Sequence, residues 1–143
     1  MTAVQTLRTV DGEVADLTHR LVTWLETGVR PDNLFADDVF ADLTLPHWRL
    51  QAEGADAAFH LREDNHPFTG EVRVEALDRT ARGFLVQFEE RWSDADGHRW
   101  YCREMIHCIV VGGRVSELLV SCTGDWDEAR QRLHAEQVRL IRP

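Results

Sequence analysis

Two glutamates, Glu90 and Glu104, have the residue type and spacing best suited to chemistry. Each stands in a segment whose apolar residues recur at every second position, the spacing of a β-strand with one buried face. Carboxylates on an apolar sheet face are costly to bury, and burial raises their pKa toward neutrality. Such a carboxyl group can take and return a proton near the working pH. We therefore expect Glu104 to act as a general base, with Glu90 assisting.

A structural interpretation stays open for both glutamates. Glu104 could instead pair with an arginine or with the end of a helix, purely to hold the fold. Glu90 is expected nearer to the end of a hairpin, where it could be solvated and serve only as a charge at the rim.

The segment 83–123 must position these carboxylates. It contains three stretches of alternating residues, separated by turn signals at 96–97 and 112–113. If Gly113 takes the left-handed position of a three-residue turn, the register follows: Val111 opposes Val115, Ile106 faces Val120, and Glu104 faces Cys122. The inward residues expected to bind a ligand are Phe84, Val86, Phe88, Trp92, Trp100, Ile106, Val120 and Cys122.

The three cysteines are expected to be reduced thiols. Cys102 and Cys122 flank Glu104 in this register, but no histidine or cation on that face would generate a thiolate, so both are interpreted as small core residues. His107 and Cys108 are adjacent in a strand and point to opposite faces. Because no paired Cys or His spacing occurs, we expect no zinc site and no cofactor.

Histidines and tryptophans near predicted loop ends complete the candidate pocket. His47 follows a strand and His60 lies on a predicted helix, and each could reach the pocket or merely cover the core. Trp48, Trp92 and Trp100 could form aromatic walls for a planar ligand.

Length and composition exclude several classes of function. The 143 residues suffice for one domain with its own core, expected over residues 1–143 with a loose arm at 1–10. The net charge of −9 argues against nucleic-acid binding. The sequence has no lysine, which excludes Schiff-base catalysis. Without a secretory pattern or an apolar run of ~20 residues, we expect a cytoplasmic protein that does not enter a membrane.

The pattern along the chain predicts an α+β domain with helices on one sheet face. The expected elements are a helix at 11–27 capped by Asp11, a helical turn at 33–38 capped by Asp32, a strand at 39–46, a loop or short strand at 47–54, a helix at 54–64, a strand at 71–78, three strands within 83–123, and a final helix capped by Asp125.

This order, with LFADDVFADL at 34–43 and GGRVSELLVSCTGDWDEA at 112–129, resembles the nuclear transport factor 2-like superfamily. Within it, the chain is most similar to SnoaL-like polyketide cyclases and ketosteroid isomerases. The resemblance implies a curved, mostly antiparallel sheet wrapped round helices to form a cone-shaped pocket, commonly with a homodimer through the convex sheet face. The segment FLVQFEE at 84–90 is similar to the isomerase strand whose alternate residues line the pocket.

The catalytic groups of those isomerases are missing from this sequence. The position of their general base is Leu43, and Asp42 beside it is expected to face away. The positions of their oxyanion tyrosine and neutral aspartic acid correspond to Leu21 and Ile106. Ordinary ketosteroid isomerase activity is therefore not expected.

The cyclases place an aspartate near the end of the last strand, where this chain has Thr123, with Asp125 two residues further on. The leading hypothesis is a small metal-free enzyme of secondary metabolism that isomerises, dehydrates or cyclises an apolar polycyclic or polyketide-like molecule. A non-catalytic protein that binds a hydrophobic ligand, and a structural dimer with a filled interior, stay open as alternatives. The row expected to face a second copy is Leu85, Tyr101, Met105, Ile109 and Leu119.

Overall fold

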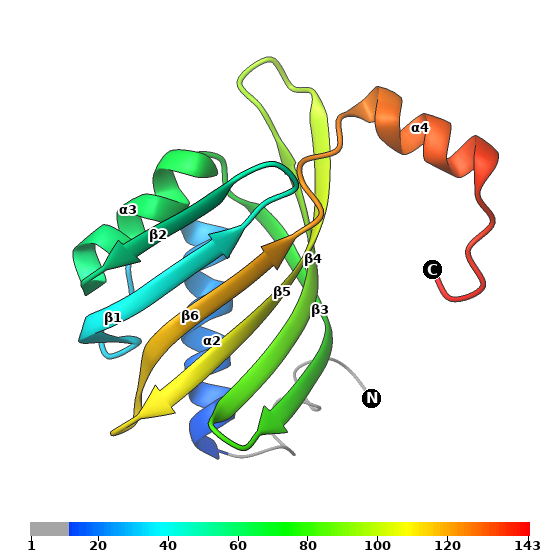
Figure 1. Cartoon of the computed structure of the whole chain (residues 1–143). Coiled ribbons are helices and arrows are strands. Elements are labelled where there is room, and N and C mark those ends of the chain that lie inside the picture. Colours follow the sequence, from blue (N-terminus) through cyan, green and yellow to red (C-terminus); the bar gives the residue numbers. More distant parts are fainter. Residues whose placement is uncertain (1–11) are drawn as a thin grey trace.

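The computed structural model describes residues 12–143, which form one six-stranded sheet with helices packed around it (Figure 1). The strand order is β2-β1-β6-β5-β4-β3, and all neighbours are antiparallel except β1 and β6, which are parallel. The strands are β1 Phe35–Thr44, β2 Arg49–Glu53, β3 Gly70–Thr80, β4 Gly83–Ser93, β5 Arg99–Val111 and β6 Arg114–Cys122. The arm expected at 1–10 and the cap expected at Asp11 lie outside the described residues.

In this described part of the chain, three helices accompany the sheet: α2 Gly12–Thr27, α3 Ala55–Asn65 and α4 Glu128–Gln137. Helix α2 forms because its apolar residues recur every three or four positions, so Val14, Leu17, Leu21 and Trp24 are all buried on one side. It ends at Gly28, which adopts a φ of 72° and donates its N–H to the Trp24 carbonyl at 2.7 Å. None of these helices is long and apolar enough to cross a membrane.

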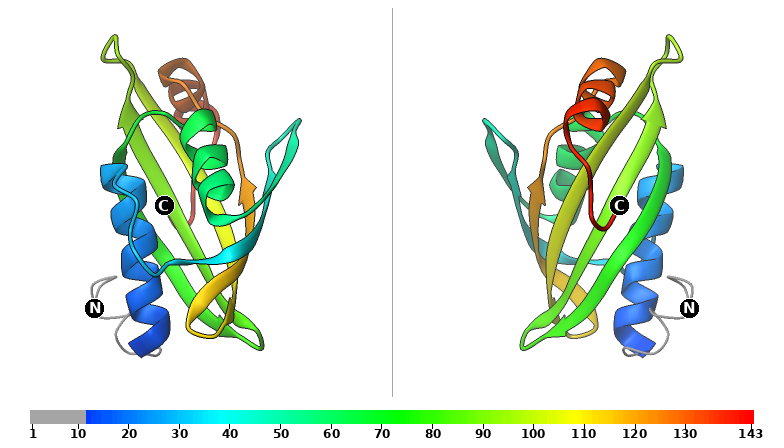
Figure 2. Two further views of the ribbon diagram at one scale, coloured as in Figure 1. Left: turned by 90° about the vertical axis from the view of Figure 1, so that its left-hand side faces the viewer. Right: turned by 90° about the vertical axis from the view of Figure 1, so that its right-hand side faces the viewer.

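The curved sheet holds α2 and α3 on its concave side, while α4 lies on the other side near one end (Figure 2). Helix α2 packs against β3 and β4, α3 against β1 and β2, and α4 against β5. The predicted α+β class with a curved, mostly antiparallel sheet wrapped round helices is confirmed. Helices α2 and α3 therefore cover different parts of the concave face.

The predicted register of the central strands is confirmed, although the predicted turn is wrong. Glu104 pairs with Cys122, but Val115 lies opposite Val110 and not Val111. Gly112 and Gly113 both have positive φ, 61° and 80°, and form a two-residue turn. An irregularity between Ile109 and Val110 offsets the shorter turn and restores the register further along β5.

Two other local predictions are wrong. In place of the helical turn expected at 33–38, the structure has a short turn followed by β1. The pairing of β1 with β6 is irregular between Phe35 and Phe40, and this break in the alternation of side chains concealed the start of the strand. The cap of α4 is Asp127, which accepts a hydrogen bond from the Arg130 backbone N–H at 2.8 Å. Asp125 is therefore free of that role.

The three positions at which the isomerases carry catalytic groups are apolar and buried here. Leu21, Leu43 and Ile106 are all at most 5% exposed and belong to the main core cluster. Asp42 faces away as expected, because its carboxylate accepts two hydrogen bonds from Arg49 at 3.1 and 2.7 Å on the outer side of β1.

Candidate functional site

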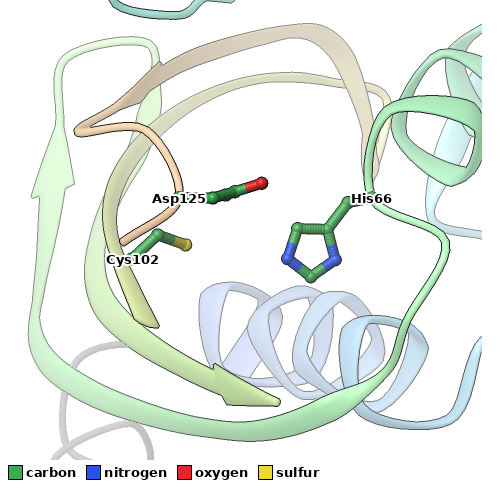
Figure 3. A group of neighbouring side chains, drawn as sticks. All are labelled: His66, Cys102 and Asp125. Carbon is green, nitrogen blue, oxygen red and sulfur yellow. The ribbon is translucent and has the colours of Figure 1, made fainter. Parts of the chain in front are cut away.

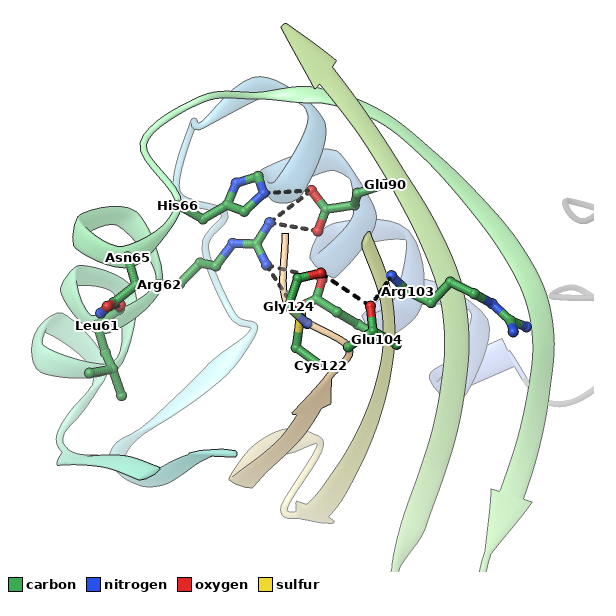
Figure 4. A network of polar contacts seen from close by, with 10 residues as sticks. Leu61, Arg62, Asn65, His66, Glu90, Arg103, Glu104, Cys122 and Gly124 are labelled. Carbon is green, nitrogen blue, oxygen red and sulfur yellow. Dashed lines mark hydrogen bonds and ion pairs between the residues drawn. The ribbon is translucent and has the colours of Figure 1, made fainter. Parts of the chain in front are cut away.

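Glu90 and Glu104 face the concave side and hold one arginine between them (Figure 4). Arg62 donates from Nη2 to the two oxygens of Glu90 at 2.6 and 2.8 Å. It donates from Nη1 to the two oxygens of Glu104, both at 3.2 Å. The side chains of Arg62, Glu90 and Glu104 are only 13%, 1% and 5% exposed. This is a buried cluster of one positive and two negative groups, with Glu90 the closer partner of the arginine.

Helix α3 positions Arg62 against the glutamates of β4 and β5. Its buried residues are Ala58 and Phe59, and Arg62 follows them at helical spacing, so it points to the same side. His66 lies one further turn along, at the C-terminal cap, where its backbone N–H donates to the Arg62 carbonyl at 2.8 Å. One helix face thus supplies both apolar packing and two polar groups to the site.

The electrostatics of the cluster differ between its members. Burial raises the pKa of Glu104 to about 7; Arg62 opposes this change, and Glu90 adds to it. Burial alone lowers the pKa of Arg62, but Glu104 and Glu90 outweigh it, so the pKa is raised overall and the guanidinium stays charged. Glu104 is therefore a carboxyl group that exchanges its proton near neutral pH.

His66 adds an imidazole whose Nε2 has no hydrogen-bond partner within residues 12–143. Its side chain is 9% exposed, its Nε2 lies 3.9 Å from a Glu90 oxygen, and its ring meets the Trp92 ring edge-on at 4.2 Å between centroids. Burial, followed by the nearby Arg62 charge, lowers the pKa of His66, so the ring is neutral at pH 7. A buried, unsatisfied polar atom beside the ion cluster indicates a place for a ligand atom.

A cavity of about 260 Å³ opens beside Glu104. It lies between the end of α3, the turn from β1 to β2, and the segment after β6. Its walls combine apolar and polar side chains: Leu43, Leu45, Pro46, His47, Trp48, Arg62, Asn65, His66, Glu104, Cys122, Gly124 and Asp125. Such a cavity, with a few converging polar groups, is typical of a small-molecule site.

A second cavity of about 220 Å³ adjoins it and shares Asn65, His66 and Asp125 with it. Its other lining residues are Pro67, Phe68, Trp92, Asp94 and Trp100. Burial raises the pKa of Asp125, and the charge of Glu104 contributes in the same direction. Asp125 lines both cavities.

Solved structures identify this arrangement of sheet and helices. An NTF2-like protein of unknown function from Burkholderia xenovorans LB400 aligns with 90% of this chain and 95% of its own, at a TM-score of 0.58 and 13% identity. The chain has the NTF2-like fold. A protein from Jannaschia sp. CCS1 described as a SnoaL-like polyketide cyclase aligns at a TM-score of 0.61 and 13% identity, covering 92% of this chain and 96% of that one.

A Δ5-3-ketosteroid isomerase from Mycobacterium sp. shares the NTF2-like fold at a TM-score of 0.58 and 18% identity, covering 76% of this chain and 91% of its own. No protein-family model matches the sequence, and no curated protein matches it. At these identities the likeness establishes the fold, which confirms the predicted resemblance at that level. Function must be argued from the site.

The NTF2-like fold brings only part of the predicted residue set to the cavities. Glu104, Cys122, His47 and Trp48 line the first cavity, and Trp92 and Trp100 line the second. The members of the predicted set that lie in the buried interior without lining either cavity are Phe84, Val86, Phe88, Glu90, Ile106 and Val120. These six side chains thus pack the interior, and the two cavities lie beside them.

His60 lies away from both cavities, contrary to the expectation that it could reach the pocket. Its side chain is 57% exposed, and its Nε2 lies 3.6 Å from a carboxylate oxygen of Asp56 one helical turn earlier. The reason is the orientation of α3, which turns Ala58, Phe59 and Arg62 toward the sheet and His60 toward solvent.

Within residues 12–143, two groups of side chains have metal-ligand atoms that lie within 4.8 Å of one another. One consists of Glu90, Cys102 and Glu104, and the other, shown in Figure 3, of His66, Cys102 and Asp125. In the first group, the guanidinium of Arg62 already binds both carboxylates. A hydrogen bond with the Cys122 thiol, together with burial, raises the pKa of Cys102, so the thiol shared by both groups keeps its proton at neutral pH. The chemistry of both donor sets therefore disfavours a metal ion.

The predicted set of site residues missed three side chains that line the cavities: Arg62, His66 and Asp125. A signal for Arg62 does exist, since it lies four positions after Ala58 and three after Phe59 on the apolar side of a helix, in a chain that also buries two glutamates. For Asp125, the resemblance to the cyclases gave a signal, since it lies two residues after the position of their aspartate. No comparable signal marks His66, which stands in a loop whose direction is set by tertiary packing.

Proposed function

We propose that this protein is an enzyme that transfers protons within a small, largely apolar molecule bound in the cavity beside Glu104. The observation that supports this most is the position of Glu104, whose carboxyl group both lines the cavity and has a pKa of about 7. A general base or acid is most effective when its pKa lies near the working pH.

The cluster assigns a role to each group. Glu104 takes a proton from a carbon next to a carbonyl group, and the electron pair of the C–H bond moves into an enolate. Returning that proton to another carbon of the same molecule completes an isomerisation; giving it to a departing hydroxyl group completes a dehydration. The ring of neutral His66 is hydrogen-bonded to the Phe68 backbone, and because Nε2 has no partner this bond is made by the Nδ1–H; Nε2 is therefore unprotonated and can accept a hydrogen bond from a hydroxyl group of the substrate. Glu90 does not line the cavity and instead positions Arg62.

The size of the cavities constrains the substrate. About 260 Å³ is slightly below the ~300–1,000 Å³ that is usual for ligand sites. A single-ring molecule fits the first cavity, whereas a polycyclic or polyketide-like substrate of secondary metabolism needs the second cavity as well. We therefore place the reacting part of the substrate over Glu104 and any extension beyond His66.

A non-catalytic binding protein is the second candidate, and one observation favours it. Both oxygens of Glu104 already accept hydrogen bonds from Arg62, as in a purely structural ion cluster. In that case the cavity holds a hydrophobic ligand, and the carboxylates serve only to fix α3 on the sheet.

Proton transfer can be tested without knowing the natural substrate. Small cyclic ketones, incubated with the protein in deuterium oxide, are expected to gain deuterium next to the carbonyl group. Since the base is the ionised carboxylate, the exchange rate should rise from pH 5 to pH 8, with its midpoint near the Glu104 pKa of about 7. Mass spectrometry of the recovered ketone measures the rate.

The control for this measurement is Glu71→Gln, which removes an exposed carboxylate on β3 and should leave exchange unchanged. Ketones that bind but exchange no faster than in buffer, at any pH in this range, would favour the binding protein.

We also propose a homodimer through the convex sheet face. Met105 is the most open member of the predicted row, at 40% exposed, and large apolar side chains there are rarely left in contact with water. Ile109 belongs to that row but is only 4% exposed within one chain, so it contributes less than expected.

Light scattering at micromolar concentration is expected to give twice the chain mass, and Met105→Asp to give the mass of one chain because it places a charge in the interface. Met105→Leu keeps the apolar surface and should remain dimeric. A monomeric wild-type protein would refute this assembly.

A further inference from the structure

The second cavity has a chemical character of its own. Two of its lining residues, Asp94 and Asp125, are acidic, and none is an arginine. The third titratable residue that lines it, His66, is neutral because its pKa is lowered by burial and by Arg62. The formal charge of the lining is therefore negative, in a protein whose net charge is −9.

Three aromatic side chains form much of its wall: Phe68, Trp92 and Trp100. Trp92 and Trp100 face each other across β4 and β5, with ring planes 11° from parallel and centroids 6.5 Å apart. The Trp100 indole N–H donates to an Asp94 carboxylate oxygen at 3.0 Å. Donation to an anion makes the indole ring richer in electrons, which strengthens its attraction for a cation over its face.

The two carboxylates differ in how they are held. Asp94 accepts further hydrogen bonds from the backbone N–H groups of Asp96 and His98, both at 2.9 Å. These contacts, with that of Trp100 foremost, lower its pKa and keep it ionised. The Asp125 carboxylate, by contrast, accepts no hydrogen bond from residues 12–143. It is available to a ligand, as is the buried Nε2 of His66.

Arg62, whose charge acts on Asp125, does not cancel this negative character. Arg62 lines the first cavity but not the second, and its guanidinium is engaged by Glu90 and Glu104. A carboxylate ligand would therefore meet two acids and electron-rich ring faces. A cation would gain from both.

We propose that the cavity formed by Phe68, Trp92, Trp100, Asp94 and Asp125 binds a positively charged amine, quaternary or protonated. That amine is one end of an elongated ligand whose uncharged part lies in the adjoining cavity over Glu104. The shared residues Asn65, His66 and Asp125 mark where the ligand passes from one cavity to the other. Only the identification of this ligand as a substrate rests on the proposed function; the binding of a cation does not.

Two probes of the same shape separate charge from size. Choline carries a trimethylammonium group, and 3,3-dimethylbutan-1-ol carries an uncharged tert-butyl group in its place. We expect choline to bind at least about fivefold more tightly, which is the range of a cation over an aromatic ring beside an acid. Titration calorimetry measures both affinities, and proton–nitrogen NMR should show the Trp100 indole N–H shifting with choline.

Matched variants locate the site. Asp125→Asn keeps the shape of the side chain and removes its charge, and Trp100→Leu removes an aromatic wall. Each is expected to weaken choline binding by about three- to tenfold while changing dimethylbutanol binding little. Leu133→Ala, at an exposed position of α4 that lines neither cavity, should not change choline binding. If Trp100→Leu does not fold, Asp125→Asn alone decides.

Equal affinity for the two probes would overturn the proposal, as would a choline-induced shift at Trp48 in place of Trp100. Both results are independent of catalysis. Glu104→Gln should bind choline with the affinity of the wild type. If this variant loses deuterium exchange but still prefers choline, Glu104 is supported as the base and the cation site is supported independently. If the protein catalyses deuterium exchange but binds choline and dimethylbutanol equally well, the proposed enzyme activity is supported and the proposed cation site is refuted.

Discussion

Glu104→Gln is expected to yield a folded protein whose turnover falls by ~10²–10⁴, the usual contribution of a positioned acid–base group. Glutamine retains the volume of glutamate and an oxygen that can still accept from Arg62 Nη1, now 3.2 Å from the carboxylate. What it loses is the ability to take a proton. Ligand affinity should therefore stay within a few-fold, since the cavity walls are unchanged.

The same variant separates catalysis from a structural role when turnover, ligand affinity and melting temperature are measured together. A structural ion cluster predicts that the melting temperature drops and that activity falls only in proportion to folded protein. Full turnover in folded Glu104→Gln would show that the base lies elsewhere, and Asp125 would then be the carboxylate to replace.

Arg62→Met is expected to have the largest effect on stability. It removes the positive charge shared by two glutamates that are 1% and 5% exposed, and breaking such a buried pair usually costs ~3–5 kcal/mol. Because Arg62 lowers the pKa of Glu104, its loss should raise that pKa further. In the protein that remains folded, Glu104 should therefore be protonated at pH 7 and act as a base only at higher pH.

Arg30 supplies a matched control, because it also binds two carboxylates, those of Asp56 and Glu63, each at 2.7 Å. Its side chain is 33% exposed, so Arg30→Met should cost only about 1 kcal/mol or less. Chemical denaturation compares the two variants. Adding Glu90→Gln and Glu104→Gln to Arg62→Met should recover much of the loss, and equal costs for the two arginine variants would contradict a buried cluster.

Alternation along strands predicted the inward direction of Glu90 and Glu104, because side chains two apart must share a sheet face. Even the pairing of Glu104 with Cys122 was correct, although the turn that implied it was not. The shorter turn at Gly112 and Gly113 and the irregularity near Ile109 have opposite effects on register. Irregularities of this kind are set by packing across the sheet, and they also concealed the beginning of β1.

The partners of the glutamates were less predictable. An inward face specifies which side chains are buried but not which helix packs over them. An arginine partner for Glu104 was therefore one of two open alternatives, and the sequence could not identify Arg62 as that partner. The same reason explains Asp125, whose spacing suggested a helix cap. The loop after β6 directs it into the site, and Asp127 takes the capping role.

Helix α3 packs on β1 and β2, and its partly buried Ala55 and Leu61 also contact the core. It buries only Ala58 and Phe59, and its N-cap, Gly54, makes no side-chain hydrogen bond. The guanidinium of Arg62 is thus a tether as well as a counter-charge, joining the last turn of the helix to β4 and β5. A proton on Glu104 removes one of the two charge pairs in that tether. We therefore expect this helix to be held less firmly over the cavity when Glu104 carries the proton that the proposed reaction would move.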